Sequence, residues 1–152
     1  MPPGSAVPVN PVASAEADAL VRALTDRLRA GDSGQTADVP TWLRGADGVV
    51  AIGGQNSVFQ LACNVLSALR QTSTDTFTAD DVRAALAACC GQSDAYLQEH
   101  FQPPANADPP AIVVPKMALL LAVMTHTGIA RVRAVHCIGN CPGMLITPSL
   151  WA

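Results

Sequence analysis

The stretch GGQNSVFQLACNVLSALR, residues 53–70, decides how the rest of the chain is interpreted. It opens with a glycine corner, after which Asn56 and Ser57 stand where a helix would begin, and both residue types favour helix N-caps. Apolar residues then recur with helical spacing, and Cys63 lies one and a half turns further in. The pattern predicts an amphipathic helix over about 57–71. Such a helix start is either an ordinary cap or the place where a nucleophile is held.

The same periodicity arguments predict a mostly helical chain with a few short strands. Caps support three helix boundaries: Ser14, Thr78 with Asp81 as a capping-box-like pair, and Gly128 as a stop. Because the helices come first and the strands gather late, we expect an α+β fold with a helical lobe and a small late antiparallel sheet. The expected helices cover about 15–30, 57–71, 79–90, 94–100 and 115–127, and the expected strands about 49–52, 129–138 and 144–152.

Composition limits the domain count and the class of function. The 152 residues suffice for one domain with a buried core, and we expect a proline-rich arm over 1–13 followed by a domain over 14–152. The net charge of −3, with no run of basic residues, argues against nucleic-acid binding. No stretch approaches twenty uninterrupted apolar residues, so we expect no membrane-spanning helix. The start lacks the pattern of a secretory signal, and five cysteines then indicate free thiols in a reducing compartment.

One pair of residues is a candidate for nucleophilic chemistry. The unpaired N–H groups and the positive dipole end of a helix N-terminus lower the pKa of a thiol placed there. The general base that assists such a nucleophile is usually a histidine from a distant segment. Ser57 stands at the predicted helix start, and His136 lies on the late strand, on the same side as Val132 and Ala134.

These residues resemble the nucleophile motif of ovarian-tumour-type (OTU) cysteine proteases, which runs Asp-Gly-Asn-Cys-Leu-Phe and opens a helix. Asn56 falls on the motif's Asn, Ser57 on its catalytic Cys, and Phe59 on its aromatic residue. The passage PKMALLLAVMTHTGIARVRAVHCI resembles the family's helix-then-strand approach to the catalytic His, which would be His136. Size and the proline-rich leader are most similar to the protease domain of tymovirus and marafivirus (Tymoviridae) replication polyproteins.

The resemblance implies an OTU-like, papain-like fold and a viral cysteine endopeptidase that processes a polyprotein and also removes ubiquitin from conjugates. Its partners would be ubiquitin and the viral replication polyprotein, and its location the host cell cytoplasm with viral replication complexes. No cofactor and no metal are expected. The terminal TPSLWA, residues 147–152, would be the remnant of a cleavage and could dock in the cleft of a neighbouring copy, and a bland flexible terminus is the alternative.

Departures from the family motif affect the expected chemistry. Ser57 replaces the nucleophilic cysteine, and Gly54 stands at the motif's Asp. The apolar Ile138, two residues after His136, cannot orient the imidazole, so we expect a dyad and not a triad. A hydroxyl is far less acidic than a thiol, and a histidine without an orienting carboxylate activates it poorly. This copy is therefore expected to be an inactive Cys-to-Ser form.

Each candidate residue also has a structural interpretation. Ser57 can be a plain helix cap, and His136 an ordinary strand histidine. Cys63 is a rival nucleophile, but a cysteine inside a helix face is expected to be buried and inert. We expect His126 to interact with a helix C-terminus and His100 to be exposed.

Two other classes of function stay open from the sequence. Cys137 and Cys141 have the spacing of zinc ligands and could combine with His126 and His136 in a small zinc module. The Ala/Leu-rich composition and the proline-rich arm also suit a non-catalytic helical interaction or assembly domain, such as a virion component. That last class predicts indifference to changes at Ser57 and His136.

Overall fold

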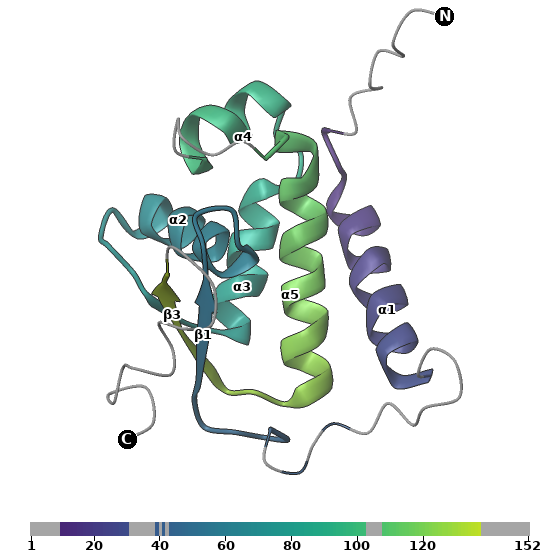
Figure 1. The fold of residues 1–152 in the computed structure, drawn as a ribbon. Coiled ribbons are helices and arrows are strands. Elements are labelled where there is room, and N and C mark those ends of the chain that lie inside the picture. Colours follow the sequence, from purple (N-terminus) through teal and green to yellow (C-terminus); the bar gives the residue numbers. More distant parts are fainter. Residues whose placement is uncertain (1–9, 31–38, 40, 42, 103–107, 138–152) are drawn as a thin grey trace, which may run out of the picture.

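Helices packed on one face of a small sheet form the fold of this computed structural model, which describes residues 10–30, 39, 41, 43–102 and 108–137 (Figure 1). The helices are α1 (Ser14–Ala30), α2 (Val58–Arg70), α3 (Ala79–Cys89), α4 (Asp94–Phe101), the 3-10 turn η1 (Pro110–Ile112) and α5 (Val113–Thr127). The strands are β1 (Val49–Gly53), β2 (Thr76–Thr78) and β3 (Arg131–His136). The α+β class predicted from the sequence is confirmed.

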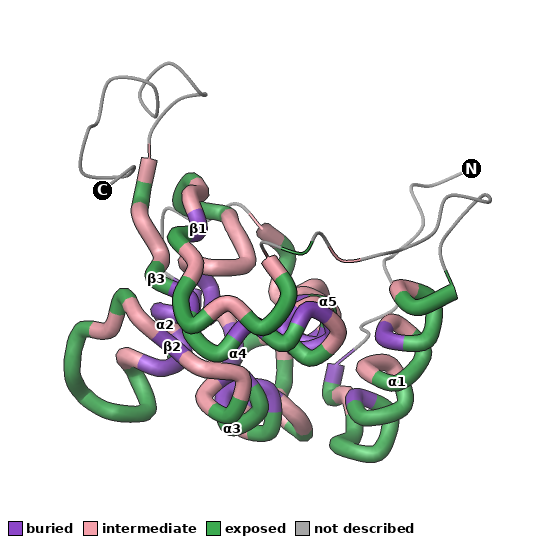
Figure 2. Tube along the Cα trace, turned by 90° about the horizontal axis from the view of Figure 1, so that it is seen from below, coloured by how far each residue is buried: buried purple, intermediate pink, exposed green. Residues whose placement is uncertain are grey.

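Helix α5 is the centre of the helical layer. It packs against α1, α2 and α3, so that the order of layers is sheet, then α2 with α3, then α5, and α1 outermost (Figures 1 and 2). Its buried side chains come from more than one face of the helix, which explains why so much of its sequence is apolar, whereas Leu119 on the remaining face is 44% exposed. The buried residues are Val113, Val114, Met117, Ala118, Leu120, Leu121, Ala122, Met124 and Thr127.

The apolar character of α5 also meets a length and composition test for a membrane span. Among the described residues, one helical stretch, Pro110–Thr127, is long and apolar enough to cross a bilayer. Half of it is buried inside the fold, and the core helix of a globular domain passes the same test. Its packing against three other helices accounts for the apolar residues.

The sheet differs from the predicted one. Its strand order is β1-β3-β2, with β1 parallel and β2 antiparallel to β3. The expected late antiparallel sheet is therefore wrong in two respects, since the sheet is mixed and β1 comes early in the chain. The cause is the long helical connection between β1 and β3, because parallel strands need a crossover of this kind.

Buried and exposed side chains alternate along the first part of β3, as the sequence predicts, so that one face of the strand packs on the helices. Val132 is buried toward the helices, whereas Arg131 and Arg133 are exposed on the other face. In β1 the same face carries Ala51, which is buried, and the opposite face carries Val50, which is 40% exposed. The sheet is thus covered by helices on one side, and its other side meets solvent (Figure 2).

Local signals placed the helix ends well. Thr78 and Asp81 form the predicted capping box at the start of α3. Gly128 ends α5 in the left-handed conformation, with φ of 72°, as expected of a C-terminal glycine. The observed α1 and α2 lie within a residue of their predicted bounds.

The end of the predicted arm lies against the fold. Asn10 is buried, and its Nδ2 donates hydrogen bonds to Asp94 Oδ1 at 2.6 Å and to the Pro110 carbonyl at 3.2 Å. The carbonyl of Val12 accepts from the Gly91 N–H at 2.9 Å. The predicted strand and tail over 144–152 lie outside the described residues.

Candidate active site

Ser57 is the N-cap of α2. A tight turn follows β1, in which the Ser57 N–H donates to the Gly54 carbonyl at 3.0 Å. The Ser57 backbone is extended (φ −70°, ψ 153°), and its Oγ accepts a hydrogen bond from the Gln60 N–H at 3.1 Å. The cap interpretation of Ser57 is therefore confirmed, and Asn56, the alternative cap, stays one residue outside. A cap at this position does not exclude a nucleophile there, because both need the unpaired N–H groups of the first turn.

The end of β1 presses closely against Ser57. A Cβ built on Gly53 would lie 2.5 Å from both Cβ and Oγ of Ser57. Only a hydrogen fits in that space, so glycine at position 53 lets the Ser57 side chain rest on the strand. The Ser57 hydroxyl is thereby fixed at the end of the sheet, on the face that the helices cover.

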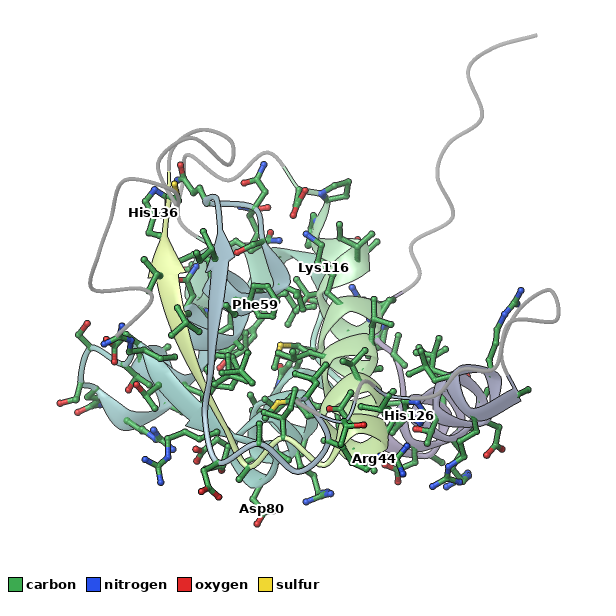
Figure 3. The ribbon with its side chains drawn as sticks, turned by 60° about the horizontal axis from the view of Figure 1, so that its bottom comes forward. Arg44, Phe59, Asp80, Lys116, His126 and His136 are labelled. Carbon is green, nitrogen blue, oxygen red and sulfur yellow. The ribbon has the colours of Figure 1, made fainter. Side chains whose placement is uncertain are left out.

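His136 occupies the same end and the same face of the sheet. It pairs directly with Gly53 in the parallel β1–β3 register, and the N–H of the following Cys137 donates to the Gly53 carbonyl at 3.0 Å. Residues paired in this way project from the same face, and neighbouring strands are only about 4.8 Å apart. Figure 3 shows His136 at the end of β3, beside β1, and its side chain is exposed.

The structure therefore brings the two predicted site residues to neighbouring positions although 79 residues separate them in the chain (136 − 57). Within the described part of the chain, the Ser57 hydroxyl is hydrogen-bonded to Gln60 and not to His136. Rotation of the Ser57 side chain out of the cap, or of the exposed imidazole, would be needed to join them. The Ile138 position on which the dyad prediction rests lies outside the described residues.

A third group at this end of the molecule was not anticipated. Lys116, in the first turn of α5, donates from Nζ to the carbonyl of Asn56 at 2.7 Å and forms an ion pair with Asp108. The side chains of both partners in this pair are about three-quarters buried, at 24% and 22% exposed. Lys116 therefore connects α5 to the turn directly before Ser57 (Figure 3).

One signal in the sequence hints at this contact. Lys116 is the chain's single lysine and stands one residue after Pro115, in the first turn of its helix. A cation there opposes the helix dipole, so its position requires a partner of opposite charge or an acceptor nearby. The sequence alone does not identify those partners, because Asn56 lies 60 residues away.

Cys63 is excluded as an accessible nucleophile by its surroundings. Its side chain is 4% exposed within the core, and burial, with a smaller contribution from Asp75, raises its pKa to about 11. Cys89 is fully buried, and burial, with Cys90 nearby, raises its pKa to about 12. Both thiols are therefore protonated and unreactive near neutral pH. Within the described part of the chain, Cys63, Cys89 and Cys90 form no disulfide.

The zinc interpretation gains no support from the described residues. Among them, no group of three or more His, Cys, Asp or Glu side chains gathers as metal ligands would. His126 lies in the last turn of α5, far from His136 (Figure 3), so these two cannot share a metal ion. His100 is exposed as predicted, and stacks on Tyr96 with ring centroids 4.0 Å apart. Cys141, the remaining candidate ligand, is outside the described residues.

The geometry defines what chemistry this end of the molecule could support. A nucleophile at position 57 would lie at the positive end of the α2 dipole, with an imidazole and an ammonium nearby. The Ser57 N–H is already bonded to Gly54, so an oxyanion would need that turn to open or would need other donors.

Comparisons of this chain with protein-family models, with curated proteins and with solved structures found no match.

Proposed function

We propose that the chain is an OTU-like viral cysteine protease and deubiquitinase whose nucleophile position carries Ser57, which makes this copy inactive. The observation that supports the proposal is the direct pairing of Gly53 with His136, because paired residues project from the same face of the sheet and Gly53 lies against the Ser57 side chain.

In the active form, a cysteine at position 57 would react as its thiolate. The sulfur attacks the carbonyl carbon of a polyprotein or ubiquitin C-terminal amide, and the C–N bond breaks as His136 gives its proton to the leaving amine. Water then adds to the acyl-enzyme, His136 takes a proton from it, and the C–S bond breaks. This step restores the thiolate and the protonated His136 with which the cycle began, and the product leaves as a carboxylic acid that ionises in solution. The serine hydroxyl of this copy lacks the acidity to begin the sequence.

The decisive test is the Ser57→Cys variant, offered ubiquitin with a fluorescent amide leaving group at its C-terminus. We expect measurable release by Ser57→Cys and none by the original chain. Adding His136→Ala to the variant should lower kcat/KM by about 100-fold or more, since general acid–base catalysis contributes on that order.

Three matched controls make the test specific. His100→Ala, on α4, and His126→Ala, at the far end of α5, remove an imidazole elsewhere and should leave the activity of Ser57→Cys unchanged. Cys63→Ala should do so too, because this thiol is buried and protonated. A folded Ser57→Cys protein that neither releases the fluorophore nor reacts with a ubiquitin carrying a C-terminal thiol-reactive group would refute the proposal.

The alternative, a non-catalytic assembly domain, corresponds to that negative outcome. It predicts that Ser57→Cys and His136→Ala behave as the original chain in every assay, and that a defined oligomer forms in solution. Sedimentation analysis of the same variants would distinguish the two proposals.

A further inference from the structure

Lys116 is held at the mouth of α2 by contacts from two different segments. Its ammonium donates to the Asn56 carbonyl at 2.7 Å, and Asp108, ahead of η1, pairs with it from the other side. The Asn56 carbonyl carbon is bonded to the Ser57 nitrogen, so the ammonium lies one peptide group away from the backbone of residue 57.

The peptide group between Asn56 and Ser57 is fixed at both ends by these contacts. Its carbonyl accepts from Lys116, and its N–H donates to the Gly54 carbonyl at 3.0 Å. Its orientation determines how the side chain at position 57 meets the first turn of α2. Lys116 therefore influences position 57 both through the shape of the turn and through its charge.

The charges around this position are unequal. The first turn of α2 contains no acidic residue, and Lys116 adds a positive charge at the end where the helix dipole is already positive. Among the described residues, the titratable groups on the neighbouring segments are His136 and Cys137, on and after β3, and Asp108 beside Lys116. An ammonium is a donor only, so Lys116 in this arrangement has no lone pair with which to take a proton from residue 57.

We propose that Lys116 is a positioning residue for the nucleophile: held on the Asn56 carbonyl, its ammonium stabilises an anion at position 57, and Asp108 moderates that effect. The inference rests on the proposed function, because only a nucleophile at position 57 makes use of this charge. The anion that Lys116 would stabilise is the thiolate of a cysteine at position 57, as in the active form.

The test measures the thiol pKa of the Ser57→Cys protein and needs no turnover. The rate at which iodoacetamide alkylates residue 57 is followed against pH, with the modified peptide identified by mass spectrometry. In this background Lys116→Met should raise the thiol pKa by about 0.5–1 unit, since the charge acts across a partly buried surface. Asp108→Asn should lower the same pKa, and Lys116→Arg should keep it within about 0.2 unit because the charge is retained.

The opposite signs separate an electrostatic role from a structural one. If the ion pair only held the turn in shape, Lys116→Met and Asp108→Asn would shift the thiol pKa in the same direction. Arg83→Met is the matched control, because it removes an exposed cation paired with Asp80 on α3 and should leave the pKa unchanged.

A second measurement leaves Lys116 intact. Because the chain has one lysine, selective ¹³C labelling of lysine gives a single side-chain Cε signal in the NMR spectrum. In Ser57→Cys this signal should shift with a midpoint equal to the alkylation pKa, and in the original chain that transition should be absent. The inference would be overturned if the chemical shift of Lys116 Cε did not change as the thiol titrates. It would also be overturned if Lys116→Met left the thiol pKa unchanged. A protein that shows both shifts but cleaves no ubiquitin amide would refute the proposed function alone.

Discussion

The starts of α2 and α3 use the same kind of cap and surround it with opposite charges. In both, a side-chain hydroxyl accepts from the N–H three residues on, Gln60 for Ser57 and Asp81 for Thr78. At α3 the Asp81 carboxylate in turn accepts a hydrogen bond from the Thr78 N–H at 2.8 Å. At α2 the corresponding residue is the neutral Gln60, and the Lys116 ammonium contacts the Asn56 carbonyl directly before the cap.

We call the start of α3 closed, because a reciprocal capping box and two acidic side chains occupy it, and the start of α2 open, because it has neither. Two aspartates in the first turn of α3, Asp80 and Asp81, compensate its dipole from within the helix. The first turn of α2 has no acidic residue, and the Lys116 ammonium of α5, paired with Asp108, contacts the Asn56 carbonyl directly before it. An anion is therefore favoured at the start of α2 and opposed at the start of α3. The same local element is structural in one place and suited to chemistry in the other.

The largest expected effect comes from filling the space at Gly53. Gly53→Ala would place a Cβ 2.5 Å from two atoms of Ser57, and we expect the free energy of unfolding to fall by about 3 kcal/mol, as overpacked sites do. Urea unfolding measures it. The double variant Gly53→Ala with Ser57→Gly should recover most of the loss, because the clashing atoms are removed while glycine still serves as a cap.

Gly48→Ala is the control for that experiment, since a Cβ there meets nothing within 4 Å. It should change stability by less than about 0.5 kcal/mol. Full stability of Gly53→Ala alone would show that Ser57 does not rest on β1 and would break the contrast between the two helix starts.

Removing the two cap hydroxyls tests the contrast between the starts of α2 and α3, and we expect intermediate losses in the free energy of unfolding. Thr78→Ala should lower the free energy of unfolding by about 1.5 kcal/mol, because it removes the cap and one side of the capping box. Ser57→Ala should cost about 0.7 kcal/mol, within the range for a cap without a reciprocal bond. Thr78→Ser, which keeps the hydroxyl, should retain most of the stability. Equal losses from the two alanine variants would contradict the distinction between a closed and an open start.

The smallest effect concerns pH. Burial raises the pKa of Asp81, but hydrogen bonds from Thr78 and the charge of Arg70 outweigh it, so the pKa lies below its ordinary value. A lowered folded-state pKa contributes stability above the unfolded value of about 3.9, and this is lost as the pH falls through the folded-state pKa.

The difference in unfolding free energy between the original chain and Asp81→Asn should therefore shrink by up to about 1 kcal/mol between pH 6 and pH 2.5. Ser57→Ala should differ from the original chain by the same amount at both pH values, because no carboxylate lies in the first turn of α2. Chemical unfolding in matched buffers measures both differences. A pH-independent effect of Asp81→Asn would mean that the hydrogen bonds from Thr78 and the charge of Arg70 do not favour the Asp81 carboxylate in the folded state.

Local signals made the helices predictable from the sequence. The Thr78 capping box, the Gly128 stop and the apolar face after Ser57 each depend on residues within a few positions of one another. Strand pairing does not, and so the parallel β1–β3 register and the three-residue β2 were missed. A strand of three residues also carries too little alternation to be recognised.

The candidate site divides in the same way. Ser57 at a helix start and His136 on a strand could be proposed from local patterns and a family resemblance. The contact of Lys116 with the Asn56 carbonyl could not, because it joins residues 60 apart and uses a backbone atom, which leaves no trace in residue types. The only hint was a cation in the unfavourable first turn of α5.

The pairing of Gly53 with His136 also has a consequence for synthesis of the chain. A nascent polypeptide that has left the ribosome only as far as the end of α5 holds β1 and α2 but not the strand that joins them to the imidazole. Contacts of such long sequence separation form late, after local helices. The β1–β3 pairing, and with it the approach of His136 to Gly53, can therefore form only once β3 has left the ribosome.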